Sequence, residues 1–251
     1  MNKQTKKAFK GFPKELFKFL SELANNNNRE WFNANKDRYR SDVVAPISEF
    51  IAAMGTRLHK IAEGYVADPR PHGGSMFRIY RDIRFSKDKR PYKEHVGCQF
   101  RHRLGKDAHA PGFYVHIAPD EVFFGGGIWR PSNPVLHKIR TAIAKNPKRW
   151  KQVIENKTLV KRFGGIGGEG LVRPPRGFDP DHPYIEDLKR KTFFAIQSVD
   201  PSLVLTPKFI TEVEKAFSAS GPLMQFIGTA LGLPRCLPQG RLKTNLSTAL
   251  F

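Results

Sequence analysis

One stretch of sixteen residues, numbered 78 to 93, constrains the fold of this chain more than any other. Its residues alternate as in a β-strand, in which successive side chains point to opposite faces. It also carries seven cations and two aspartates, namely Arg78, Arg81, Arg84, Lys87, Lys89, Arg90, Lys93, Asp82 and Asp88. A solvated loop needs no apolar residue at every second position, and a buried strand does not accept so many charges without partners. The stretch therefore predicts a strand pair in which the charges are paired with one another or with a ligand.

The alternation predicts a β-hairpin of residues 77–85 and 92–100 in one particular register. This register keeps the mostly apolar sets of the two strands on one face, and a slip of one residue would mix them. Its main pairs are Phe85–Tyr92, Ile79–Cys98, Asp82–His95 and Arg84–Lys93. A structure that pairs Asp82 with a residue other than His95 or its diagonal neighbours would contradict this register.

Arg81 falls on the apolar face of this hairpin, where an unpaired guanidinium would cost several kcal/mol. Glu94 is its diagonal neighbour and its first candidate partner. We therefore expect a structural ion pair between Arg81 and Glu94 that locks the hairpin.

The other face of the hairpin predicts an anion-binding site. Arg84 opposite Lys93 is a like-charge pair, which is unfavourable across two strands unless an anion lies between them. Guanidinium groups bind phosphate and carboxylate through two parallel hydrogen bonds. The ligand-binding candidates are Arg78, Arg84, Lys89, Tyr92 and Lys93. The alternative is a solvated outer face whose charges form salt bridges.

Asp82 and His95 are the catalytic candidates, because a carboxylate beside an imidazole can orient and charge it for acid–base chemistry. A surface salt bridge is the simpler interpretation of the same pair, so whether the chain is an enzyme stays open. Turn chemistry alone explains Asp88 and Pro91 at the tip.

The rest of the chain predicts an α+β fold. Apolar residues recur at helical spacing over 13–24 and 29–61, with Asn28 as the cap of the second segment. Strand patterns cover 76–85, 92–101, 112–118 and 121–129, and their short links favour antiparallel neighbours. The C-terminal part is mixed, with helices at 134–145, 147–156, 182–190, 206–218 and 222–232, a strand at 192–199 and a long loop at 163–177. We expect N-terminal helices packed on a central antiparallel sheet, followed by a mixed helical C-terminal part.

Length and charge indicate one domain with anionic partners. The 251 residues suffice for a single α+β domain at 11–232, between a basic disordered tail at 1–10 and a C-terminal tail at 233–251. The net charge of +20 favours a small anionic ligand or, as the alternative partner, nucleic acid. No apolar run is long enough for a membrane span, so no membrane partner is expected. The oligomeric state is not predicted.

Cysteine and histidine usage gives further expectations. Cys98 and Cys236 are too few for a disulfide framework or a cysteine-rich zinc site. Without a secretory segment near the start, they favour a reducing cytoplasmic location. His95 and His116 could share a metal only if their strands adjoin, and no second close histidine supports such a site, so no metal and no cofactor is predicted.

The long loop at 163–177 is a candidate lid over the basic face, because loops of this length are often functional. It contains a literal G-x-G-x-x-G, but the prolines that follow cannot open the helix that a dinucleotide fingerprint requires. Arg173, Arg176 and Asp179, with Lys189 and Lys191 further on, are its possible contributions to the site.

The charged stretch resembles the signature of a known family. The matching pattern is Arg78-x-x-Arg81-Asp82-x-Arg84-Phe85-x-x-Asp88-Lys89-x-Pro91-Tyr92-Lys93. Segments 27–32, 125–129 and 175–179 match as well, so the resemblance covers nearly all of the expected domain. The family is a widespread bacterial one, also found within longer fungal proteins, that is known as a conserved hypothetical protein or domain of unknown function. The resemblance implies one intact domain and an important motif, and it implies no reaction.

Three functions are thus compared. The first is a small phosphate- or carboxylate-bearing ligand bound in a basic cleft on the sheet, and turnover of this ligand is an open extension. The second is a nucleic-acid-binding module that uses the basic surface, although no known nucleic-acid motif is present. The third is an ion-pair network with a purely structural role.

Overall fold

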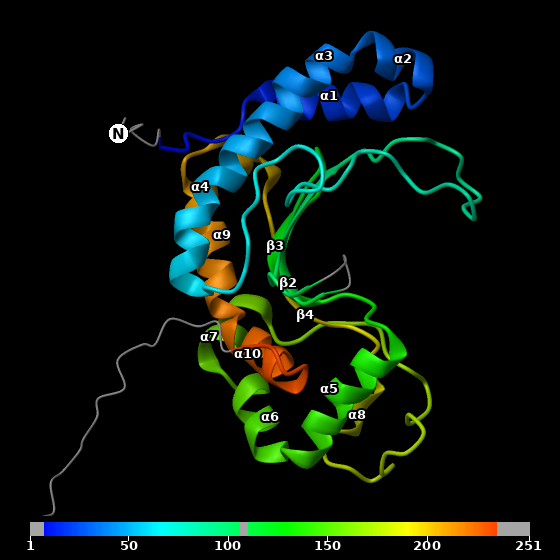
Figure 1. Cartoon of the computed structure of the whole chain (residues 1–251), viewed down its shortest axis with the longest axis vertical. Coiled ribbons are helices and arrows are strands. Elements are labelled where there is room, and N and C mark those ends of the chain that lie inside the picture. The colour runs from blue at the N-terminus through cyan, green and yellow to red at the C-terminus, as the bar shows by residue number, and fades with distance from the viewer. Residues whose placement is uncertain (1–7, 106–109, 235–251) are drawn as a thin grey trace, which may run out of the picture.

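The computed structural model describes residues 8–105 and 110–234 (Figure 1). Most of the two predicted tails, including Cys236, therefore lies outside the described residues. The N-terminal part is helical, as predicted, and Asn28 caps its second helix by accepting a hydrogen bond from the backbone N–H of Trp31 at 2.9 Å. The elements are α1 (Lys14–Asn25), α2 (Arg29–Ala34), α3 (Lys36–Arg38), the π-helical turn η1 (Tyr39–Val44) and α4 (Ala45–Ile61).

A four-stranded antiparallel sheet follows, in the order β1-β2-β3-β4. Its strands are β1 (Val96–Arg101), β2 (Gly112–Ile117), β3 (Val122–Ile128) and β4 (Phe193–Val199). The predicted strands at 112–118, 121–129 and 192–199 are confirmed, and β1 is shorter than the predicted strand at 92–101. The predicted α+β class with a central antiparallel sheet is confirmed as well.

The mixed C-terminal part surrounds β4. It consists of α5 (Asn133–Lys145), α6 (Pro147–Ile154), α7 (Lys157–Phe163), α8 (Ile185–Lys189), the 3-10 turn η2 (Pro201–Leu205), α9 (Lys208–Ala219) and α10 (Gly221–Ala230). The sequence patterns missed α7, whose N-cap Asn156 accepts a hydrogen bond from Leu159 N–H at 3.1 Å. The predicted lid loop between α7 and α8 begins by extending the sheet, because Gly167 pairs with Phe194.

Among the described residues, helices cover one face of the sheet and leave the other without a helical layer. In Figure 1, α4 and α9 lie on one side of the strands, and residues 76–93 project on the other side. The covered face carries apolar residues of β1, β2 and β3, among them Cys98, Phe100, Phe113, Val115 and Phe124, all fully buried. The opposite face, which we call the outer face, carries Gly97, Gln99, Tyr114, His116, Phe123 and Gly125, as the strand register requires. None of these outer-face residues belongs to either hydrophobic core cluster.

Residues 76–93, which we call the arm, do not form the predicted strand pair. Cys98 pairs with Met76 and not with the predicted Ile79. Tyr92 pairs with Tyr80 and not with the predicted Phe85. The predicted register is therefore wrong. Six residue steps separate Tyr92 from Cys98 but only four separate Met76 from Tyr80, so the two sides cannot continue one regular ladder.

Candidate functional site

The tip of the arm, residues 81–91, is held by a recurring local arrangement. In Asp82-x-Arg84, the backbone N–H of Arg84 donates to Asp82 at 3.3 Å and its guanidinium donates to the same carboxylate at 2.7 Å. Asp88 and Arg90 repeat the arrangement at 3.0 and 2.8 Å. Such side-chain bonds to nearby backbone compete with a ladder of strand hydrogen bonds. They are the physical reason why a regular hairpin does not form.

The ion pairs of the tip keep its carboxylates charged. The Arg84 guanidinium lowers the pKa of Asp82 to about 2. Arg90, together with Arg81, holds the pKa of Asp88 well below its ordinary value. These groups therefore form an ion-pair network that stays charged throughout the neutral range.

The predicted pair of Arg81 and Glu94 is not formed. Arg81 donates to Asp88 at 2.7 Å, and Glu94 accepts from Arg90 at 2.6 Å and from Asn27 at 2.8 Å. Asn27 also exchanges two hydrogen bonds of 3.1 Å with the backbone of Tyr92. The corner between α1 and α2 thus anchors the arm. This contact joins segments 27–32 and 78–93, which the family resemblance had identified separately.

The predicted ligand residues are dispersed along the arm. Arg84 lies at the tip, with 76% of its side chain exposed and with Asp82 as its partner. Lys89 donates to the carbonyl of Ile83 at 3.1 Å and so closes the tip. Tyr92 is 3% exposed and stacks on Phe32 with ring centres 4.1 Å apart, so its side chain lies in the core and not in a ligand site.

Lys93 and Arg78 lie together at the base of the arm. The Lys93 ammonium donates to the Arg78 carbonyl at 2.8 Å and lies 5.4 Å from the centre of the Phe77 ring. Burial, and then the Arg78 charge, lower the pKa of Lys93. Among the described residues, neither cation forms an ion pair with a carboxylate. The like-charge pair predicted for Arg84 and Lys93 is thus found between Arg78 and Lys93 instead.

His95 meets a second histidine on the outer face and is not paired with Asp82. The rings of His95 and His116 have centres 4.3 Å apart, and His116 stacks on Phe123 at 4.5 Å and 7°. The Tyr114 hydroxyl lies 3.5 Å from His116 Nδ1. A row of rings therefore runs on the outer face from His95, the residue before β1, across β2 and β3. The predicted Asp82–His95 dyad does not exist, because Asp82 is held by Arg84 at the tip.

Both imidazoles are neutral at pH 7. Burial, with smaller effects from His116 and Lys93, lowers the pKa of His95 to about 4. Burial also lowers the pKa of His116 to about 4, and only 11% of its side chain is exposed. Neutral imidazoles can accept protons or hydrogen bonds, whereas they add no positive charge to the face.

The sequence predicted only some of the residues that lie near His95 on this face. The contact between His95 and His116 required that β1 and β2 adjoin, which the sequence left open. Tyr114 and Phe123 were missed as site residues, although the alternation of Tyr114 and His116 with buried apolar residues of β2 was a usable signal. Among the described residues, no group of three metal-binding side chains is found.

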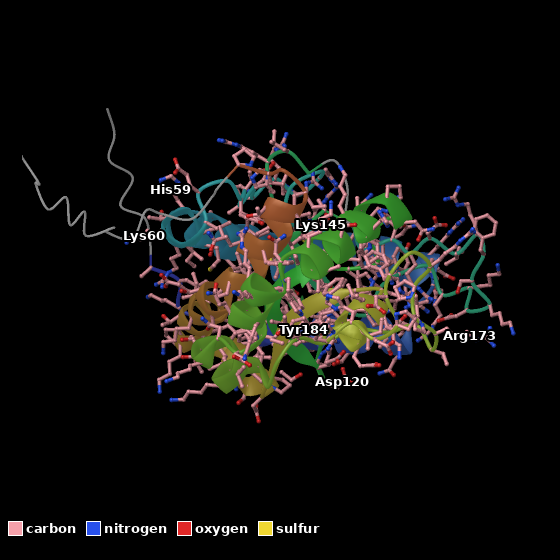
Figure 2. All side chains as sticks on the ribbon, turned by 90° about the horizontal axis from the view of Figure 1, so that it is seen from below. His59, Lys60, Asp120, Lys145, Arg173 and Tyr184 are labelled. Atoms are coloured by element: carbon pink, nitrogen blue, oxygen red, sulfur yellow. The ribbon has the colours of Figure 1, made fainter. Side chains whose placement is uncertain are left out.

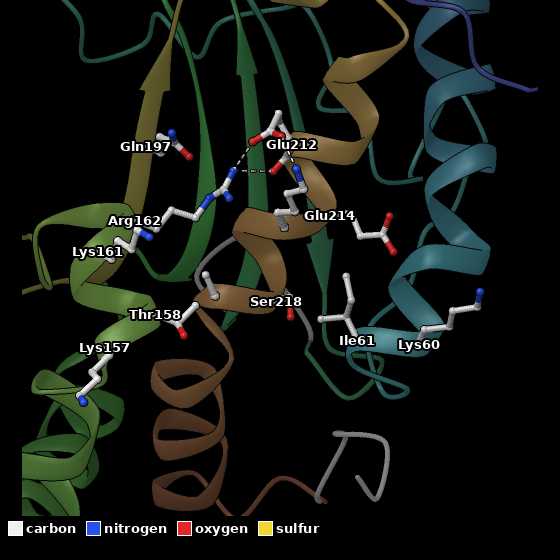
Figure 3. A pocket seen from close by; sticks show the side chains of 12 residues that line it. Lys60, Ile61, Lys157, Thr158, Lys161, Arg162, Gln197, Glu212, Glu214 and Ser218 are labelled. Carbon is white, nitrogen blue, oxygen red and sulfur yellow. Dashed lines mark hydrogen bonds and ion pairs between the residues drawn. The ribbon is translucent and has the colours of Figure 1, made fainter.

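A hollow lies between α4, α7 and α9, away from the outer face (Figure 3). It has a volume of about 930 Å³, and its cations are Lys60, Lys157, Lys161, Arg162 and Lys215. Its central carboxylate, Glu212, is already engaged by Arg162 and Lys215, at 2.8 Å each. Figure 3 shows Lys60 and Lys157 pointing away from each other, so these cations do not converge on one point. We therefore place the candidate site on the outer face.

The surface beyond β4 carries part of the predicted lid. Arg173 is exposed in the loop between α7 and α8, and Figure 2 shows it at the molecular margin, far from Lys60 and His59. Glu169 of this loop accepts a hydrogen bond from Arg130 at 2.9 Å, which ties the loop to the end of β3. Closure of this loop over the outer face stays a prediction.

Fold and site together define an α+β protein with an antiparallel sheet that is covered by helices on one face and carries a basic arm. The chain belongs to the family described as conserved hypothetical protein (DUF2461), whose model matches residues 15–226. The resemblance inferred from the sequence is thereby confirmed. A comparison with curated proteins finds no match. Within the described residues, no helix has the length and apolar character needed to cross a bilayer.

Proposed function

We propose that the outer face binds a small ligand bearing a phosphate or carboxylate group, with the anion placed between Arg78 and Lys93. One observation carries the proposal: the partly buried Lys93 ammonium donates to the Arg78 carbonyl, the Arg78 charge helps to lower the Lys93 pKa, and within the described part of the chain no carboxylate forms an ion pair with either cation. An anion between them would relieve this repulsion and accept charge-assisted hydrogen bonds from both.

The neighbouring residues suit the non-ionic part of such a ligand. His95, His116 and Tyr114 offer neutral donors and acceptors, and Phe77 and Phe123 offer apolar rings. A few convergent polar groups among aromatic side chains are typical of small-molecule sites. The proposal is for binding. A neutral imidazole would also be available as a general base, which replaces the Asp82–His95 dyad as the route by which turnover could occur.

The purely structural interpretation fits another part of the arm. Asp82, Asp88 and Glu94 all accept hydrogen bonds from neighbouring arginines, so we propose that this network fixes the shape of the arm. It does not include Lys93 or His95. We also retain a cytoplasmic location as a proposal, supported by a cysteine content too low for a disulfide framework.

The test is a thermal-shift screen of nucleotides, sugar phosphates and small carboxylates. A ligand at 100 times its Kd stabilises the folded state by about 2.7 kcal/mol, or by roughly 5–10 °C in Tm for a chain of this size. Calorimetry then compares the wild type with Lys93→Gln and Arg78→Gln. Each variant should bind about 10-fold more weakly or worse, because a charge-assisted hydrogen bond is lost.

Arg84→Ala is the matched control, since it removes an arginine of the same arm that lies at the exposed tip. It should bind like the wild type. If no compound of the panel stabilises the wild type, or if Lys93→Gln and Arg78→Gln bind as well as Arg84→Ala does, the proposed site is wrong.

A further inference from the structure

The tip of the arm carries a surface that the ligand site does not use. Phe85 is 95% exposed, the highest exposure among the large apolar residues of the described chain. The guanidinium of Arg84 lies 5.8 Å from the centre of its ring. The tip thus presents an aromatic ring and a cation side by side, away from the core clusters and away from the outer face.

The tip is also strongly basic. Residues 81–91 contain two aspartates and five cations, namely Arg81, Arg84, Lys87, Lys89 and Arg90, so five minus two leaves a formal charge of +3 in eleven residues. Lys87 has no hydrogen bond or ion pair within the described part of the chain, and Lys89 bonds only to a backbone carbonyl. Arg84 and Arg90 remain more than half exposed although they are paired. The cations are therefore available to an external polyanion.

The shape of the tip is preset before any partner binds. Asp82 and Asp88 hold both a backbone N–H and a guanidinium of the arginine two residues later. The arm is a narrow two-sided ribbon, joined at Tyr80 and Tyr92, that projects from the body of the molecule (Figure 1). Preorganisation of this kind reduces the entropic cost of association.

We propose that the arm tip contacts nucleic acid, with its lysines and arginines on the phosphates and with Phe85 stacked on or between bases. The major groove of duplex DNA, about 12 Å wide, admits a two-stranded ribbon. Inserted apolar side chains and aromatic stacking platforms are common in nucleic-acid recognition. Within residues 81–91, Phe85 is the one exposed large apolar side chain, and five cations accompany it. This composition favours a nucleic-acid backbone over the apolar interior of a membrane.

The experiment measures binding of the full chain to a fluorescent DNA duplex and to the corresponding single strand, by anisotropy, over a series of salt concentrations. Lys87→Gln/Lys89→Gln should lower the log–log salt slope for the duplex by up to about 1.8, since each phosphate contact contributes about 0.9. Phe85→Ala should weaken binding by about 5-fold or more with little change in slope. All three side chains are exposed, so the variants should fold like the wild type.

The matched control is Lys60→Gln/Lys157→Gln, which removes the same charge from exposed lysines of α4 and α7. This control should retain the salt slope of the wild type. Preferred binding to either the duplex or the single strand supports the proposal, provided that it depends on Phe85. The proposal is overturned by absence of binding at low salt, by equal losses in the two lysine pairs, or by wild-type binding of Phe85→Ala. Phe85-dependent binding to phosphatidylserine vesicles, without Phe85-dependent binding to nucleic acid, would also overturn it.

The two proposals are tested independently. Lys93→Gln removes the ligand site but leaves the tip intact. It should therefore bind nucleic acid like the Lys60→Gln/Lys157→Gln control, which removes two positive charges where Lys93→Gln removes one. Failure of the small-ligand screen would therefore not decide the role of the tip, and loss of nucleic-acid binding would not decide the role of the outer face.

Discussion

Replacement of His116 by glutamine should make the stability of the protein less sensitive to acid. His116 is nearly buried between His95 and Phe123, and burial lowers its pKa from the ordinary 6.5 to about 4. Between these two pH values, the unfolded chain binds the proton and the folded protein does not. The stabilising effect of a neutral His116 is thus complete above pH 6.5 and is lost progressively as the pH falls towards 4.

The magnitude follows from the two pKa values. Lowering the pH from 7.5 to 5.5 should cost the wild type ~1.3 kcal/mol through His116 alone, and lowering it to 4.5 should cost ~2.5 kcal/mol. His116→Gln cannot take up this proton, so its free energy of unfolding should fall less over the same interval by about these amounts. Any loss of packing in the variant is present at every pH and cancels in the comparison.

Urea unfolding of both proteins at pH 7.5, 5.5 and 4.5 measures the difference. A histidine titration followed by NMR gives the folded pKa directly, and the His116 ring signals should shift only near pH 4. The reasoning is refuted if the two proteins lose stability in parallel as the pH falls, or if His116 titrates near pH 6.5 in the folded protein.

Three further predictions concern the sheet and the arm. Gly125→Ala should destabilise the protein by about 2–3 kcal/mol in urea unfolding, because the added methyl group would overlap a backbone carbonyl of β4. Gly55→Ala in α4 meets no close atom and should stabilise the protein by ~0.5–1 kcal/mol. Equal effects of the two substitutions would contradict this reasoning. Cys98 is fully buried, and burial raises its pKa to about 12. A thiol reagent should therefore modify Cys98 only after denaturation. Mass spectrometry that shows modification of Cys98 in the native protein would disprove this. Asn27→Ala removes three hydrogen bonds to Tyr92 and Glu94 and should lower the free energy of unfolding by about 1–3 kcal/mol. Asn26→Ala removes one exposed hydrogen bond and should lower it less. The reverse order would be inconsistent with the anchoring role of Asn27.

The sequence predicted those elements whose side-chain pattern reflects burial. Phe113 and Val115 alternate with the less apolar Tyr114 and His116, and both lie on the covered face of the sheet. Cys98, placed by parity on the apolar face, is fully buried. Asn28 could be identified as a cap because capping depends on residues only three positions apart.

The arm could not be predicted in the same way, because contacts outside its own alternation decide its conformation. Asp82 and Asp88 bind the arginines two residues later, so local bonds replace the strand ladder. Asn27 binds Tyr92 and Glu94 across more than sixty residues of sequence, which no pattern within the arm reveals. As a result, Asp82 and Arg84 lie at the tip of the arm, and they do not face Lys93 and His95 as the predicted register required.

An NMR titration with inorganic phosphate and with citrate, observing the rings of His95 and His116, tests the account most directly. A small anion held between Arg78 and Lys93 should cause saturable shifts of both histidine rings, and these shifts should disappear in Lys93→Gln and persist in Arg84→Ala. The proposed site would be contradicted by the absence of saturable shifts, or by equal shifts in Lys93→Gln.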